Sequence, residues 1–142
     1  MANYCAATRT NYFRVKDEEK FRDIVHACVA EDELKIFERA EPTGDRLFGL
    51  GCEGTISGVE DSEDDDYPDY SYDAFTSALQ EVIPEGEAII IMEARHEKLR
   101  YVVGYASVIT KTEIKSVDME RDAIKLARGM LNNPDFCTIT EY

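Results

Sequence analysis

Basic residues are scarce in this 142-residue chain, which has sixteen Lys and Arg against thirty Asp and Glu. None lies between Arg46 and Arg95, an interval that holds thirteen acidic residues. The net charge of −14 therefore belongs almost entirely to this interval. Because Lys and Arg supply most of the affinity for phosphate backbones, we expect no direct binding to nucleic acid. A basic protein surface is the partner that such a charge favours.

Long apolar runs and a signal peptide are also missing. The longest apolar run, residues 88–92, is far shorter than the roughly 20 residues that a membrane helix needs. The N-terminal residues lack the apolar core of a signal peptide. We therefore expect a cytoplasmic protein of a bacterial host cell that makes no membrane contact.

Cysteine pairs with metal-binding spacing are absent. The four cysteines, Cys5, Cys28, Cys52 and Cys137, are separated by long, unequal gaps without a C-x-x-C motif. Cys28 falls on an apolar helical stripe, and Cys52 and Cys137 fall on expected strands, so we interpret these three as buried, reduced thiols. No cofactor and no metal site is predicted.

The residues that are present favour one folded domain over residues 1–142, with an acidic loop at about residues 60–72. Hairpins beside single helices, without a β-α-β rhythm, predict an α+β fold. Its sheet should be mixed or largely antiparallel, with about three helices packed on it. Four glycines between residues 47 and 59, Gly49, Gly51, Gly54 and Gly58, indicate bulges or close backbone approach where a helix crosses the sheet.

Alternating side chains predict strands at residues 8–15, 34–39, 46–52, 88–94, 99–110, 114–117 and 136–140. The strand over 88–94 should be central, and a turn should follow at His96-Glu97. Helical spacing predicts helices over about 18–30 with Asp17 as cap, from Ser71 or Asp73 to about Val82, and from Asp118 onward. The buried face of the last helix should comprise Ile124, Ala127, Met130 and Leu131.

The stretch over residues 60–73, EDSEDDDYPDYSYD, is the candidate binding site. Tyrosines lie between its acids, and tyrosine is enriched in protein interfaces. Acids spaced in this way can imitate a phosphate backbone and occupy the basic channel of a nuclease. The alternative is a solvated loop that keeps the protein soluble. The predicted partner-binding residues are Glu60, Asp61, Glu63, Asp64, Asp65, Asp66, Tyr67, Asp69, Tyr70 and Tyr72.

The residues also allow two other chemistries. Asp64, Asp66 and Asp69 resemble a calcium cluster, but the glycine and the closing glutamate of an EF-hand loop are missing. A catalytic alternative is a small hydrolase or metal-dependent enzyme built on Glu93, His96 and Arg100. A histidine beside carboxylates can titrate near neutral pH, although a polar hairpin turn explains the same residues.

Four stretches, RTNYFRVKDEEKFRDIV, LFGLGCEGTI, EARHEKLRYVVGYA and LARGMLNNPDF, resemble those of a family of small acidic proteins. Bacterial phages, plasmids and conjugative elements commonly carry this family. The resemblance implies a cytoplasmic accessory protein of a mobile element and assigns no catalytic residue. Small acidic proteins in that setting are often similar to anti-CRISPR or anti-restriction inhibitors, several of which are DNA mimics.

Together these observations predict a non-enzymatic acidic inhibitor or adaptor. Its expected partner is a basic nucleic-acid-handling protein, first of all a nuclease such as a CRISPR effector. An antitoxin or immunity protein with a basic toxin partner shares the same electrostatics and stays open.

Overall fold

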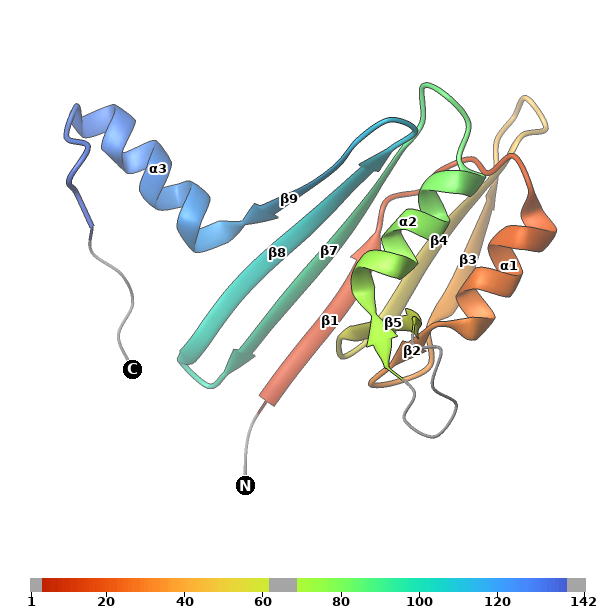
Figure 1. Cartoon of the computed structure of the whole chain (residues 1–142), viewed down its shortest axis with the longest axis horizontal. Helices are drawn as coiled ribbons and strands as arrows, with labels where there is room; N and C mark the ends of the chain where they lie inside the picture. The colour runs from red at the N-terminus through yellow and green to blue at the C-terminus, as the bar shows by residue number, and fades with distance from the viewer. Residues whose placement is uncertain (1–3, 62–68, 138–142) are drawn as a thin grey trace.

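The computed structural model describes residues 4–61 and 69–137 (Figure 1). Its helices and antiparallel strands confirm the predicted α+β class, and every strand pairing among the described residues is antiparallel. The strands are β1 (Tyr4–Thr10), β2 (Val29–Ala30), β3 (Lys35–Ala40), β4 (Arg46–Glu53), β5 (Ile56–Glu60), β6 (Tyr70–Ser71), β7 (Ala88–Glu97), β8 (Arg100–Thr110) and β9 (Ile114–Asp118). The helices are α1 (Glu18–Ala27), α2 (Tyr72–Val82) and α3 (Met119–Leu131).

The larger sheet has six strands in the order β3-β4-β1-β7-β8-β9, and the smaller sheet has three in the order β2-β5-β6. The prediction of a central strand in the apolar run 88–94 is confirmed, since β7 lies between β1 and β8. The strands of the smaller sheet were not predicted. Two of them contain only two residues each, and glycines interrupt the alternation of side chains around β5.

Helices α1 and α2 cover one face of the larger sheet over β3, β4, β1 and the beginning of β7 (Figure 1). The core between these layers contains the fully buried Phe13, Phe21 and Phe75. The ring of Phe21 lies 5.7 Å from that of Phe13 and 5.4 Å from that of Phe48, between centroids. The far ends of β7 and β8, near their connecting turn, lie beyond both helices (Figure 1).

The first strand begins and ends earlier than predicted, at Tyr4–Thr10 in place of 8–15. The Asn11 side chain accounts for its end. Its Nδ2 donates to the carbonyl of Ala88 at 3.0 Å, and its Oδ1 accepts from the N–H of Ile90 at 2.8 Å. The chain then leaves the sheet edge, and Phe13 becomes a buried isolated bridge to Phe48.

Helix α1 has the predicted cap but ends three residues early. Asp17 accepts a hydrogen bond from the N–H of Lys20 at 3.0 Å. Apolar spacing carried the prediction to Ala30, but Cys28 is extended, with φ −77° and ψ 133°. This turn of the chain lets Val29–Ala30 pair with β5, so pairing with a distant strand overrides local helical spacing.

Helix α2 agrees with its prediction, and Ser71 is the cap, accepting a hydrogen bond from the N–H of Ala74 at 3.0 Å. The close approach predicted for the glycines is confirmed at Gly58 of β5, where φ is +120°. A Cβ added there would lie 2.1 Å from the carbonyl oxygen of Ser71. Only glycine therefore lets the start of α2 cross β5 at this distance.

The turn between β7 and β8 lies at Lys98-Leu99, two residues beyond the predicted His96-Glu97. His96 and Glu97 remain in β7 because they pair with Cys5 and Tyr4 of β1. Lys98 takes up the tight bend with a positive φ of 55°. The polar character of His96-Glu97 thus marked a long, partly solvated hairpin and not its tip.

Helix α3 begins at the predicted cap, since Asp118 accepts a hydrogen bond from the N–H of Arg121 at 3.0 Å. The predicted buried face is wrong, because no residue of α3 is buried. Met130 is 80% exposed and Leu131 59% exposed. The helix follows β9 without an intervening residue. Its first turn packs on the sheet, where Met119 lies against Gly104 of β8, and the rest of the helix runs away from the sheet (Figure 1).

The closing strand predicted at residues 136–140 is not found in its described part. Phe136 and Cys137 belong to no strand, and residues 138–140 lie outside the described residues. The carbonyl of Phe136 accepts a hydrogen bond from Arg128 Nε at 2.8 Å, which holds the chain against α3. Cys137 is consequently exposed, contrary to prediction, while Cys52 is buried and Cys28 half-buried.

Candidate interaction surface

The two ends of the acidic stretch are joined by a short hairpin of β5 and β6. Glu60 pairs with Tyr70, and the N–H of Asp61 donates to the carbonyl of Asp69 at 2.8 Å. The side chains of all four residues are exposed. Their backbone is therefore fixed by pairing while their polar groups face solvent. The other predicted partner-binding residues of the loop, Glu63, Asp64, Asp65, Asp66 and Tyr67, lie outside the described residues.

Tyr72, also predicted to bind a partner, has a structural role. It is the first residue of α2 and is partly buried, with its ring 6.4 Å from that of Phe75. Its hydroxyl shares a hydrogen bond of 2.8 Å with the hydroxyl of Ser107. Burial raises the pKa of Tyr72, a shift that the Ser107 hydroxyl partly offsets. This tyrosine links α2 to β8, so only a small part of its side-chain surface is accessible to a partner.

Additional acids, which sequence reasoning missed, lie at the same end of the molecule as the hairpin. The N–H of Glu31 donates to the carbonyl of Thr55 at 2.9 Å, and Thr55 Oγ1 donates to Glu31 Oε1 at 2.6 Å. The β2–β3 connection is thereby attached to the β4–β5 turn (Figure 1). The consecutive acids of residues 31–33 were a visible signal, but their distance from the main stretch concealed it. We define the acidic end as its exposed described acids: Glu31, Asp32, Glu33, Glu53, Glu60, Asp61, Asp69 and Asp73.

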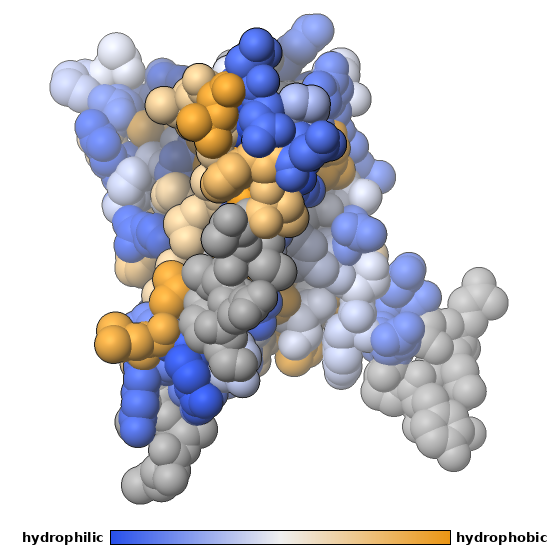
Figure 2. All heavy atoms as spheres, turned by 90° about the vertical axis from the view of Figure 1, so that its left-hand side faces the viewer, coloured by the Kyte–Doolittle hydropathy of each residue, from blue (hydrophilic) through white to orange (hydrophobic). Residues whose placement is uncertain are grey.

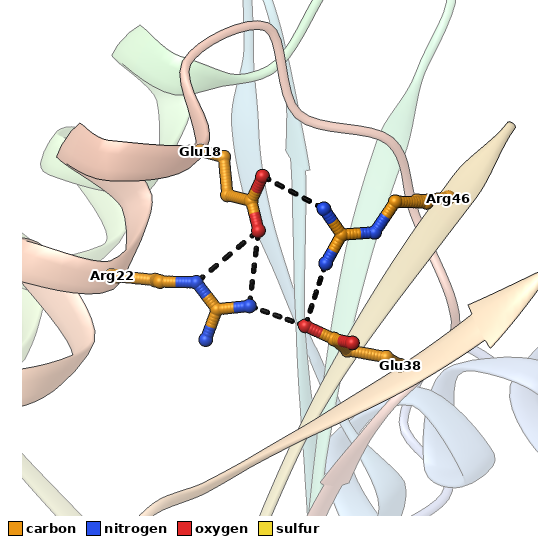
Figure 3. Close-up of polar contacts among 4 residues, drawn as sticks. All are labelled: Glu18, Arg22, Glu38 and Arg46. Carbon is orange, nitrogen blue, oxygen red and sulfur yellow. Dashed lines mark hydrogen bonds and ion pairs between the residues drawn. The ribbon is translucent and has the colours of Figure 1, made fainter.

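None of the acids of the acidic end forms an ion pair with another described residue, in contrast to acids elsewhere. Figure 3 shows a four-membered network in which Glu18 and Glu38 alternate with Arg22 and Arg46. Glu18 lies 3.0 Å from each arginine, Arg46 lies 2.9 Å from Glu38, and Arg22 closes the ring by contacting Glu38. The hydrogen bond from Arg22, reinforced by the charge of Arg46, lowers the pKa of Glu18. Negative charge is thus neutralised here and left unpaired at the acidic end.

Two of the described basic residues, Arg9 and Lys35, border the acidic end. Arg9 and Lys35 line a hollow of about 510 Å³ together with Asp32, Glu33 and Glu53. The guanidinium of Arg9 stacks on the ring of Phe37, 4.1 Å from its centroid, and donates to the Tyr12 hydroxyl at 3.2 Å. Stacking directs the positive charge of Arg9 toward an aromatic partner. The acidic end therefore keeps a strong excess of negative charge.

Metal-ligating residues are not gathered anywhere in residues 4–61 and 69–137, where no group of three or more His, Cys, Asp and Glu could hold an ion. Of the calcium-like acids, Asp64 and Asp66 lie outside these residues and Asp69 is exposed. Burial raises the pKa of Cys28 to about 12 and also raises that of Cys52. Both thiols therefore stay protonated at neutral pH, a form that neither attacks nor binds metals.

The residues of the catalytic alternative do not come together. Glu93 pairs with Thr8 and His96 pairs with Cys5, and successive residues of a strand point to opposite faces. Glu93 and His96 therefore lie on different faces of the sheet. Arg100 forms an ion pair with Glu97 at 3.5 Å, and His96 Nδ1 lies 3.2 Å from the carbonyl of Lys98. These contacts are those of a polar hairpin.

A cleft on the helix-covered side was not predicted from the sequence. It has a volume of about 240 Å³ and is bordered by Tyr72, Glu93, Arg95, Tyr105 and Ser107, with Thr8, Ile56, Ile91 and Ala106 completing its lining. Although burial opposes the charge of Arg95, the Tyr4 and Tyr105 hydroxyls raise its pKa. Its Nε is 3.8 Å from Glu93 and has no hydrogen-bond acceptor among the described residues. The tyrosines and the arginine offer both apolar and polar contacts to a partner.

Comparison with protein-family models, with curated proteins and with solved structures found no match. Within the part of the chain that the structure describes, no helix has the length and apolar character needed to cross a membrane.

Proposed function

We propose that this protein is a non-enzymatic inhibitor or adaptor that uses its acidic end to bind a basic surface on a nucleic-acid-handling protein. A CRISPR effector nuclease is the first candidate partner, and other nucleases with a basic channel follow. The observation that carries the proposal is the set of exposed acids without ion pairs at one end of the molecule. Like charges gathered on one surface repel one another, and a basic partner relieves this repulsion.

The arrangement of the backbone supports the proposal. Strand pairing holds Glu60, Asp61, Asp69 and Tyr70 beside one another, so less conformational entropy is lost when a partner binds them. Tyr70 adds an exposed aromatic ring among the acids. Opposite charge speeds association and makes it sensitive to salt, because screening shortens the range of attraction to about 10 Å at 0.1 M.

The test compares two triple variants that remove the same charge from opposite ends. Glu60→Gln, Asp61→Asn and Asp69→Asn remove three of the eight negative charges of the acidic end without changing side-chain size. Glu19→Gln, Glu85→Gln and Glu113→Gln form the matched control, because these residues are also exposed. They belong to the start of α1, the α2–β7 connection and the β8–β9 connection, which lie at the end of the molecule opposite to β5 and β6 (Figure 1). A pull-down from bacterial lysate supplemented with candidate nucleases, with nucleic acid digested, selects the partner. Affinity is then measured by biolayer interferometry.

We expect the acidic-end variant to weaken binding by about tenfold or more and the control to change it less than about threefold. Higher salt should reduce the difference between the affinities of the two variants. Equal affinities of the two variants would contradict the proposal, and so would binding that salt leaves unchanged. Recovery of a basic toxin with the same pattern would instead identify an antitoxin or immunity protein. His96→Ala should leave binding unchanged.

A further inference from the structure

Helix α3 carries an apolar stripe that the other described residues leave largely uncovered. Ala123, Leu126, Ala127, Met130 and Leu131 recur at three- and four-residue spacing, which places them on one side of the helix. Leu126 is 66% exposed, and Met130 and Leu131 are also mostly exposed. Figure 2 shows hydrophobic side chains gathered along the middle of the face that includes α3. Such a stripe is typical of a helix that packs on another surface.

The connection to β9 prevents α3 from covering its own sheet. Strand β9 ends at Asp118, which is also the helix cap, so no loop residue allows the chain to reverse. Asp118 is held in this place by its own contacts, since its N–H donates to Asp122 Oδ2 at 2.9 Å. The helix therefore projects outward from the edge of the sheet (Figure 1). Within residues 4–61 and 69–137, no other helix or strand covers its stripe.

The chain also has a sheet surface that lacks a helix, which we call the open trough. Its floor is the uncovered part of β7 and β8, and the cleft of about 240 Å³ continues there into a second hollow of about 370 Å³, with Arg95 in both. The second hollow is lined by Tyr4, Arg95, Glu97, Tyr101 and Val103. Residues 101–107 of β8 span about 20 Å. The 13 residues of α3 also span about 20 Å, so helix and trough match in length.

The local charge of α3 and of the open trough permits a second copy of this chain as the occupant. Within α3, Arg121, Lys125 and Arg128 outnumber Glu120 and Asp122, which gives the helix a charge of +1. Since the whole chain carries −14, the remainder carries −15. Glu93 and Glu97 line the open trough, but Glu93 lies 3.8 Å from Arg95 and Glu97 lies 3.5 Å from Arg100, so the trough carries little net charge. The weakly basic helix therefore meets no repulsion in the trough, whereas the acidic bodies of two copies repel each other, and the burial of apolar surface has to outweigh that repulsion.

The buried area favours a reciprocal arrangement. Half the surface of a helix 20 Å long and 10 Å across is about 300 Å², so one docked helix buries about 600 Å² including the trough. A single docking event is below the range of stable interfaces, whereas two events bury about 1,200 Å² and reach it. Two copies provide two helices and two troughs, which a foreign partner does not.

We propose that the protein is a homodimer in which each copy lays α3 into the open trough of the other. The apolar stripe around Leu126 and Met130 lies on the tyrosines and Val103 of the trough floor. The exchange places the basic side chains of α3 near Glu93 and Glu97. The dimer leaves the acidic end of each copy outside the interface.

The test measures molar mass by size-exclusion chromatography with light scattering, from about 1 to 100 µM, and the dimer dissociation constant by analytical ultracentrifugation. Wild-type protein should show twice the monomer mass of 16.1 kDa. The double variant Leu126→Glu/Met130→Glu should raise the dissociation constant at least about a hundredfold, because each dimer loses four buried apolar side chains. Val103→Glu in the trough should weaken the dimer as well. Circular dichroism checks that each variant is folded.

Two controls make the result specific. Leu99→Glu adds the same single charge as Val103→Glu, at a residue that is 91% exposed at the hairpin tip, and should leave the dimer intact. Met92→Glu alters the opposite face of the sheet, where Met92 pairs with Arg9 and Ala106, and should also have no effect. A monomeric wild type at the highest concentration would overturn the proposal. A dimer that Met92→Glu abolishes and the α3 variant does not would also overturn it, because the interface would then be the opposite sheet face.

Discussion

Replacing Gly58 by alanine should destabilise the fold far more than the same change at Gly44. Both glycines have a positive φ, +120° at Gly58 and +92° at Gly44, which costs an alanine about 1–2 kcal/mol. Around Gly44 an added Cβ meets no atom within 4 Å, so this backbone cost is the whole effect there. Gly44 is therefore the matched control, since the substitution and the strain are the same.

At Gly58 the added Cβ would lie 2.1 Å from the carbonyl oxygen of Ser71, 2.3 Å from its carbon and 2.6 Å from the nitrogen of Tyr72. These atoms are backbone at the cap of α2 and cannot rotate away. Either β5 separates from β6 or the first turn of α2 shifts, and the Ser71 cap and the Tyr72–Ser107 hydrogen bond are strained. We estimate a total loss of about 3–5 kcal/mol, in the upper range for one substitution.

Urea denaturation followed by circular dichroism measures both variants against the wild type. We expect Gly44→Ala to lower the free energy of unfolding by about 1–2 kcal/mol and Gly58→Ala by at least about 3 kcal/mol. Similar losses in the two variants would refute the close crossing of β5 and α2. If the slope of the free energy of unfolding against urea concentration is the same in variants and wild type, their folded and unfolded states are comparably compact.

Three further measurements address other parts of the molecule. The exposed thiols of Cys5 and Cys137 should react with a thiol reagent at pH 8 well before those of Cys28 and Cys52, whose pKa values burial raises. Mass spectrometry measures the rate of labelling at each cysteine. Labelling of Cys28 as fast as that of Cys137 in the folded protein would contradict the prediction. The pKa of Glu18 is lowered in the folded state, so its stabilising effect should be complete above its unfolded pKa of about 4.3 and should disappear as pH falls through the folded pKa. The urea midpoints of Glu18→Gln and of the wild type should therefore converge in acid. A difference between the midpoints that stays constant with pH would argue against the ion-pair network. Tyr72→Phe and Ser107→Ala should each cost about 1 kcal/mol, and a double-mutant cycle should give a coupling of similar size, whereas additive losses would indicate that the 2.8 Å hydrogen bond contributes nothing.

Much of the secondary structure was predictable because its signals are local. The caps Asp17, Ser71 and Asp118 each accept a hydrogen bond from an N–H three residues onward, and this contact depends on neighbouring residues only. The limits that sequence reasoning placed wrongly have a common cause. Strand β1 ends where the Asn11 side chain binds the backbone of Ala88 and Ile90, and α1 ends where the following residues pair with β5. Local spacing of side chains does not reveal these distant partners.

The candidate site was predictable only in part. The concentration of negative charge between Arg46 and Arg95 is visible in the sequence, and it predicted a partner-binding role for Glu60, Asp61, Asp69 and Tyr70. The neighbouring acids 31–33 join this surface through the contact of Glu31 with Thr55, across 24 residues of chain. The separation of Glu93 from His96 likewise follows from the pairing of β7 with β1, since only a strand and not a turn places them on opposite faces.

The sequence by itself determined the α+β class, the starts of the helices and the sign and location of the charge, because each depends on composition or on residues within one turn of each other. Only the tertiary structure decided which surfaces remain uncovered. The stripe of α3 has the same spacing as a buried helix face, and nothing local distinguishes the two. Because β9 passes directly into α3 at Asp118, most of α3 is carried away from its own sheet, and the same apolar residues face solvent.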